Sequence, residues 1–202
     1  ASLRPAGDKP GQWNVGLRRD WNRTLDALSN SEASFRVLSV HEGIERESSL
    51  EAGVKKRFRG AQTRADIDLI LAHHPHVPRG LEMNEDGQVI AFGLGNALLH
   101  GAANLAGRGV AQDFGLMLRL YYRTSSEGPV LEALEAVPLT GMHRAPRPVS
   151  ASEARLRVMA LNALSTQASG ERALILEPDT DTGFGLWCDE APTTKRAKAL
   201  CD

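Results

Sequence analysis

Three histidines, His73, His74 and His76, lie within four positions directly after a short apolar segment, residues 67–72. That segment contains β-branched side chains and is too short for a helix of its own, so it is predicted to be a buried strand. Pro75 lacks a backbone N–H and restricts φ, which ends the strand and stiffens the loop. Neutral imidazole is the commonest metal ligand. Half of the chain's six histidines lie in this cluster, which favours a metal or catalytic site over the alternative, a polar loop without function.

A second predicted strand, residues 34–40, ends at His41, Glu42 and Gly43. Between the two strands, residues 49–63 place apolar side chains on one face, as in an amphipathic helix. A strand–helix–strand unit makes the two strands parallel, with their carboxyl ends at one edge of the sheet. We therefore expect His41 to lie beside the 73–76 cluster, at the edge where ligands collect in such sheets.

The remaining elements are predicted from periodicity and turn residues. Residues 81–94 form a hairpin, followed by a tight turn that directs Asn96 at the site, and residues 100–112 form a glycine-rich surface loop or lid. The other predicted elements are a helix over 13–28, strands over 113–124 and 130–139, a helix over 150–165, short strands over 173–176 and 183–187, and a frayed segment from residue 189.

The composition fits one globular domain, or part of a larger one. The chain has 202 residues, 42% of them hydrophobic and 24% charged, with a formal net charge of −1. No apolar run has the length of a membrane span, and the near-neutral charge provides no electrostatic basis for binding nucleic acid. Cys188 and Cys201 are compatible with a reducing compartment or with one disulfide. The compartment stays open between cytoplasmic and envelope-associated.

Two stretches, SVHEGIE and ADIDLILAHHPHVPRGLEMNEDGQVIAFGLGN, resemble the CapA-type family of the calcineurin-like metallophosphoesterase superfamily. The family is named for poly-γ-glutamate capsule synthesis, and the resemblance covers roughly residues 8–165. It implies an α/β (α+β) fold, a four-layer αββα metallophosphoesterase-like sandwich with two divalent metal ions (Mn, Zn, Fe, Ca or Mg) at strand ends. The chain departs from the family's motifs at Glu42, Ala72, Gly93 and Ala97, where the family has Trp, Gly, Ser and Phe.

The resemblance also implies roles for individual residues. Histidines that match the family's ligand positions are expected to bind metal. One further histidine is expected to act in catalysis, by substrate contact or proton transfer. Three polar residues are expected to bind substrate. These are His41, His74 and His76 for metal, His73 for catalysis, and Arg79, Asn96 and Glu42 for substrate.

The family's first-half metal ligands have no counterpart in this sequence. We therefore expect the chain to be the carboxyl-terminal portion of a longer enzyme or one subunit of a split one, with the N-terminal half of the same fold as its partner. Residues 1–168 would form the metallophosphoesterase-like domain, and residues 169–202 a terminal β-hairpin and tail.

Three functions compete at this point. The first is a metal-dependent, hydrolase-like enzyme that acts on a peptide or poly-γ-glutamate substrate. Its reaction would be metal-assisted hydrolysis or peptide tailoring such as epimerisation. The same site could instead hydrolyse a phosphoester. The second is a non-catalytic assembly or binding subunit that retains the fold. The third is a domain stabilised by one zinc ion, held by the histidines and a carboxylate such as Glu42 or Glu45.

Overall fold

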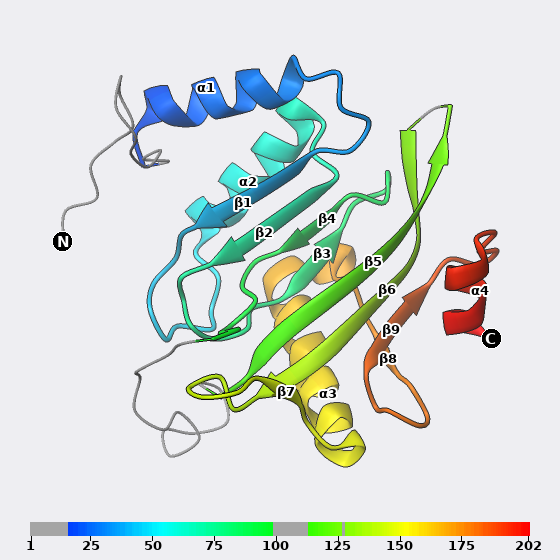
Figure 1. Cartoon of the computed structure of the whole chain (residues 1–202). Coiled ribbons are helices and arrows are strands. Elements are labelled where there is room, and N and C mark those ends of the chain that lie inside the picture. The colour runs from blue at the N-terminus through cyan, green and yellow to red at the C-terminus, as the bar shows by residue number, and fades with distance from the viewer. Residues whose placement is uncertain (1–15, 99–112, 127) are drawn as a thin grey trace.

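The computed structural model describes residues 16–98, 113–126 and 128–202, which form a mixed α/β fold with two β-sheets (Figure 1). Its elements are α1 (Arg18–Ser29), β1 (Val37–His41), α2 (Ala52–Ala65), β2 (Leu69–His73), β3 (Leu81–Met83), β4 (Val89–Ala91), β5 (Gly115–Ser125), β6 (Gly128–Thr140), β7 (Arg147–Pro148), α3 (Ala151–Ser169), a 3₁₀ turn η2 (Gly170–Arg172), β8 (Glu177–Pro178), β9 (Gly185–Cys188) and α4 (Lys195–Cys201).

The first sheet has the strand order β1-β2-β4-β3. β1 and β2 are parallel, as the crossover prediction requires, and β2 is also parallel to β4. β3 and β4 are antiparallel and form the predicted hairpin. In the β1–β2 register His41 is the partner of His73, so the two predicted strand ends do meet at one edge of the sheet.

The second sheet is built on the long antiparallel pair β5 and β6, which confirms the two strands predicted over 113–124 and 130–139. Its order is β5-β6-β9-β8, and β7 pairs with β6 beside this path. The pairing of β5 with β6 shifts between Tyr121 and Tyr122, as at a β-bulge, which increases the local twist.

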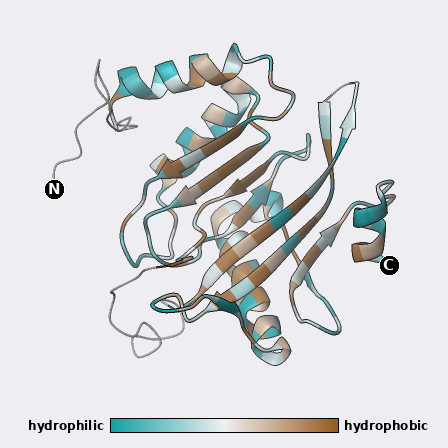
Figure 2. Cartoon of the chain, viewed as in Figure 1, coloured by the Kyte–Doolittle hydropathy of each residue, from teal (hydrophilic) through white to brown (hydrophobic). Residues whose placement is uncertain are grey.

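Two apolar cores hold these layers together. The first lies between α1, α2 and one face of the first sheet, and includes Trp21, Phe58 and Phe92. The second joins the other face of the first sheet to the second sheet and α3, and includes Leu134 and Leu161. In Figure 2, apolar residues concentrate along the strands of the first sheet, while the surrounding loops are largely polar.

Helix α3 begins at a conventional cap: the Ser150 hydroxyl accepts a hydrogen bond from the backbone N–H of Glu153. The helix runs to Ser169, beyond the predicted end near residue 165. It packs against β3, β6, β8 and β9, and therefore bridges both sheets.

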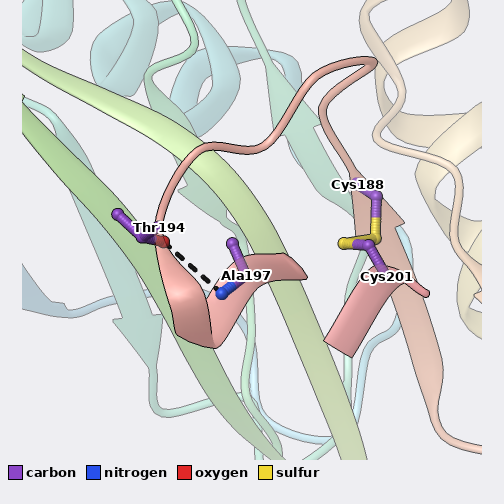
Figure 3. Close-up of a disulfide and its surroundings, with 4 residues drawn as sticks. All are labelled: Cys188, Thr194, Ala197 and Cys201. Carbon is purple, nitrogen blue, oxygen red and sulfur yellow. Dashed lines mark hydrogen bonds between the residues drawn. A yellow bond between two sulfur atoms is a disulfide. The ribbon is translucent and has the colours of Figure 1, made fainter. Parts of the chain in front are cut away.

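The last segment differs from the sequence prediction in two respects. The short strand predicted over 173–176 is displaced, since β8 covers Glu177–Pro178 instead. The segment from residue 189, predicted to be frayed, contains helix α4, and a disulfide joins Cys188 to Cys201 (Figure 3). The fraying prediction was wrong because the bonds that hold this segment come from residues distant in the sequence.

Some predictions lie outside the described residues, namely the contribution of Trp13 to the first helix and the loop over 100–112. Among the helices of the described ranges, none combines the length and apolar character needed to cross a membrane. The predicted boundary at residue 168 stays a prediction, although β8 and β9, which follow it, pair into the second sheet.

Candidate metal centre

The candidate site lies at the carboxyl ends of β1 and β2, where two loops leave the first sheet together (Figure 1). Backbone hydrogen bonds tie these loops to each other. The N–H of Glu42 donates to the carbonyl of His73 at 2.9 Å, and the N–H of Arg46 donates to the carbonyl of Pro75 at 2.6 Å. The residues after His41 are thereby held against the histidine cluster.

The backbone at the cluster adopts conformations that side-chain-bearing residues rarely take. His74 has φ of 112° and His76 has φ of 60°. Positive φ is unfavourable for a residue with a Cβ, and it persists where the surrounding structure enforces it, commonly at functional sites. Pro75 separates the two and is itself buried, so the loop presents both imidazoles from a constrained backbone.

Glu45, His74 and His76 form a group with metal-binding geometry: each offers a ligand atom, and these atoms all lie within 4.8 Å of one another. Two ligand atoms on one divalent ion are about 4 Å apart at most, since each bond is about 2.0–2.2 Å long. Binding of one ion by all three would therefore require these side chains to move closer together. Glu45 is exposed and both histidines are partly buried, so the group opens toward solvent.

His76 is oriented by Asn96. The Asn96 Nδ2 group donates to the backbone carbonyl of His76 at 3.1 Å, which directs Oδ1 toward the ring, 2.7 Å from Nδ1. Since Oδ1 can only accept, Nδ1 carries the proton and the lone pair is left on Nε2. A hydrogen bond of this type fixes the tautomer of a metal-binding histidine.

The turn that carries Asn96 depends on Gly95, whose φ is +68°. A Cβ at this position would lie 2.2 Å from the carbonyl oxygen of Phe114, so only glycine fits. Asn96 itself is 6% exposed. The expectation of a tight turn that directs Asn96 at the site is therefore confirmed, while its predicted contact with substrate is untested.

His41 and His73 form a separate pair beside this group. Their Nδ1 atoms are 3.1 Å apart, so one ring donates and the other accepts. The His73 Nε2 atom also lies 3.4 Å from the Ser39 hydroxyl. The His74 ring connects the two arrangements, with its centroid 4.5 Å from that of His41 and 6.1 Å from that of His76.

Burial and mutual repulsion favour the neutral form of this pair. Burial, and then the charges of His74, His73 and His76, lower the pKa of His41 below its ordinary value. Burial, and then His74, lower the pKa of His73 as well. Both shifts favour the neutral ring, the state in which imidazole binds metal or accepts a proton.

The structure places Arg79 differently from the prediction. It was expected near the mouth of the site, but its side chain is 0% exposed. Its guanidinium donates to Glu51 Oε2 at 2.6 Å and to the carbonyl of Glu47 at 3.0 Å, with a longer contact to the carbonyl of Ile44. Arg79 thus stabilises the loop that carries Glu45.

Glu42 also has an internal partner, because its carboxylate forms an ion pair with Arg57 of α2. The Arg57 guanidinium lies over the Trp21 ring of α1, 4.7 Å from the centroid. Glu42 therefore anchors the loop after β1 to the two helices, and the structure does not bring it to the metal-binding group.

The predicted ligand set and the observed group overlap in two residues. His74 and His76 belong to both, whereas the group takes Glu45 as its third member where His41 was predicted. Sequence reasoning named Glu45 only as an alternative carboxylate. It did not name Glu51, because nothing local to residue 51 signals a buried arginine 28 positions later.

One part of the chain matches a known protein family. Residues 6–100 match the family model described as bacterial capsule synthesis protein PGA_cap. All the residues of the candidate site, from His41 to Asn96, lie within the matched region. A search of the curated proteins found no match.

The fold and the site thus define a mixed α/β protein with a candidate metal centre at parallel strand ends. The family match over residues 6–100 confirms the resemblance to the CapA type that the sequence predicts.

Proposed function

We propose that the chain provides the histidine-rich part of a divalent metal centre in a capsule-synthesis enzyme that acts on a peptide or poly-γ-glutamate substrate. The observation that carries this proposal is the group Glu45, His74 and His76, with ligand atoms within 4.8 Å of one another. The family match supports a role connected with capsule synthesis. The reaction would be metal-assisted hydrolysis or peptide tailoring such as epimerisation.

The donor set fits a divalent ion. Imidazole nitrogens together with one carboxylate suit Zn, Fe and Mn, and the Asn96 hydrogen bond leaves His76 Nε2 available. Three protein ligands leave a position open, as in catalytic rather than structural sites. The chemistry that such an ion supplies is polarisation of a carbonyl or phosphoryl oxygen.

Side chains of this chain would then transfer protons and position the substrate. The pKa of His73 is lowered by burial and by His74, and its ring is hydrogen-bonded to His41, so it can accept a proton and pass its charge to a neighbouring ring. His41 retains Nε2 for a second ion or for substrate. Glu42 and Arg79 would act by holding the loops on which these groups stand.

The proposal includes a partner that completes the site, the N-terminal half of a four-layer metallophosphoesterase-like sandwich. Among the described strands β1 pairs only with β2, and its residues alternate between exposed and buried. Val37 is 42% exposed, although its register partner Leu69 is 7% exposed. Parallel strands are normally buried on both faces, so β1 is a suitable edge for added strands. Carboxylates from those strands would supply the remaining ligands.

A non-catalytic assembly subunit is the second candidate. The observation that favours it is the internal pairing of Glu42 and Arg79, two of the three residues expected to contact substrate. A phosphoester hydrolase would use the same metal centre on a different substrate, and a single structural zinc ion would bind the same three donors with its fourth position closed.

Metal content tests whether the proposed metal centre forms at all. Protein purified without added metal or nickel affinity would be analysed by mass spectrometry, together with His74→Ala, His76→Ala and a matched control, His143→Ala, outside the cluster. We expect about one or two divalent ions per chain, lost in the first two variants and kept in the control. Absence of metal in every sample, with added Zn²⁺ or Mn²⁺ also failing to bind, would exclude a metal-dependent enzyme whose site is complete within this chain.

Activity would be tested on the metal-loaded protein with poly-γ-glutamate and with a chromogenic phosphate monoester. Release of amino groups or a change in glutamate chirality supports the peptide substrate, and release of the chromophore supports the phosphoester. His73→Gln should lower the rate by about 100-fold or more while metal content is unchanged. Full metal loading with no turnover of either substrate, when the N-terminal half of the fold is also present, would favour the assembly subunit.

A further inference from the structure

The segment after β9 is attached to the second sheet at three points, none of which belongs to the metal centre. The first is the disulfide between Cys188, the last residue of β9, and Cys201 of α4, which are 13 positions apart (Figure 3). Because β9 pairs with β6, the disulfide fixes α4 to the middle of the sheet. In the described ranges there is no free cysteine.

The second attachment is the Glu132 carboxylate on β6. It accepts hydrogen bonds from the backbone N–H groups of Thr193 and Thr194, each at 2.9 Å, and from the Thr193 hydroxyl. The Glu132 carbonyl also accepts from the N–H of Asp189 at 2.9 Å. Glu132 is 1% exposed, so the segment covers the group that binds it.

The third attachment is the helix itself. The Thr194 hydroxyl caps α4 by accepting a hydrogen bond from the N–H of Ala197 (Figure 3). Ala197 is 0% exposed, and so is Ala133, the register partner of Cys188. α4 contacts both β6 and β9, beyond the point where β8 stops pairing at Leu186. The helix therefore covers a part of the sheet that would otherwise be open.

We propose that the protein matures in an oxidising compartment outside the cytoplasm, where the Cys188–Cys201 disulfide locks residues 189–202 onto the second sheet. Structural disulfides persist in oxidising compartments and are rare in the cytosol. A seven-residue helix is too short to be stable alone, so it depends on its attachments to the sheet, of which the disulfide is the covalent one. The proposal does not rest on the metal centre.

The oxidation balances by thiol–disulfide exchange with a disulfide donor, either a dithiol oxidase or oxidised glutathione. The thiolate of one cysteine attacks the donor disulfide and releases one donor thiol. The second cysteine then attacks the mixed disulfide and releases the other donor thiol. The two protein thiols are oxidised, and the donor disulfide is reduced to two thiols.

The compartment is tested by the thiol state in the native host. Cells would be quenched in acid, and free thiols labelled with a maleimide before and after reduction, followed by mass spectrometry of the peptides with Cys188 and Cys201. We expect labelling of both cysteines only after reduction. Labelling of both before reduction would overturn the oxidising compartment.

The lock is tested by limited trypsin digestion, since Lys195, Arg196 and Lys198 all lie in α4. Cleavage at these residues should be about tenfold or more faster in reduced wild type and in the Cys188→Ser/Cys201→Ser variant than in the oxidised protein. Cleavage at Arg144, in the loop after β6, should be unchanged and is the internal control. Equal rates at α4 in oxidised and reduced protein would overturn the lock, and reduced wild type decides the matter even if the variant fails to fold.

Discussion

The side-chain amide of Asn96 contacts His76 twice, through Oδ1 at 2.7 Å from Nδ1 and through Nδ2 at 3.1 Å from the backbone carbonyl. The two residues are 20 positions apart and leave different strands of the first sheet. This double contact explains how a histidine with a left-handed backbone keeps a defined ring orientation, and it determines which nitrogen is free to bind an ion.

Replacement of Asn96 by alanine should weaken metal binding without removing a ligand. The His76 ring would lose its orienting acceptor, and loss of such a partner typically costs about 10–100-fold in metal affinity. Competition with a chelator, for Zn²⁺ or Mn²⁺, would measure the change. Asn96→Asp keeps an oxygen acceptor for Nδ1 and should retain more affinity than the alanine variant. Unchanged affinity in Asn96→Ala would contradict the assigned role.

Gly43 should tolerate no side chain. Its φ is +127°, and an added Cβ would lie 2.8 Å from Pro75 Cγ and 3.0 Å from Arg79 Nη1. We expect Gly43→Ala to lower the free energy of unfolding by about 1–3 kcal/mol, measured by urea denaturation. Gly60, inside α2, has nothing within 4 Å of its added Cβ, so Gly60→Ala should be neutral or stabilise by up to about 1 kcal/mol. Similar losses in both variants would refute the steric argument.

The Arg79–Glu51 ion pair should matter to stability. Burial raises the pKa of Glu51, but the hydrogen bond and charge of Arg79 outweigh it, and the pKa lies below its ordinary value. Glu51→Gln would leave the guanidinium, which is 0% exposed, without a counter-charge. We expect a loss of about 3 kcal/mol, because removing one partner of a buried pair is costly.

Glu47→Gln is the matched control for that measurement. The Glu47 carboxylate is exposed, and within the described residues its hydrogen bonds come only from Ser49. The backbone carbonyl of Glu47 accepts a hydrogen bond from Arg79, and the substitution retains this carbonyl. The change in unfolding free energy should stay below about 0.5 kcal/mol. A larger effect in Glu47→Gln than in Glu51→Gln would show that the ion pair is not the source of stability.

Glu132 should make stability depend on acid pH. Burial raises the pKa of Glu132, but the hydrogen bonds from Thr193 and Thr194 outweigh it and lower the pKa to about 2, from an ordinary value of 4.5. The unfolded chain therefore binds the proton first as pH falls. The stability that this group contributes is complete above about pH 4.5 and is lost as pH falls from 4.5 towards 2.

Glu132→Gln tests that dependence. The variant should be less stable than wild type at pH 7, because the amide accepts fewer hydrogen bonds, and the difference should shrink between pH 4.5 and 2. Urea denaturation at several pH values would follow both proteins with the disulfide intact. A difference that is constant across this range would show that Glu132 titrates normally in the folded protein.

Much of the first sheet could be predicted from the sequence because its signals are local. An apolar run before His73, an amphipathic segment before it and a turn at residues 84–87 are sufficient to predict a strand, a crossover helix and a hairpin. Chain connectivity then requires that His41 and the 73–76 cluster share one edge. For the same reason local signals were sufficient to predict where the candidate site lies.

Contacts between distant segments determine which of those groups meet and what supports them. Glu45 joins His74 and His76 because Arg79 and Glu51 close the intervening loop, and Glu42 is withdrawn because Arg57 binds it. The segment after residue 189 is ordered by Glu132, which is 61 positions from Thr193. Such contacts depend on side-chain packing between distant segments. Sequence periodicity reports only on neighbouring residues, so it cannot predict them.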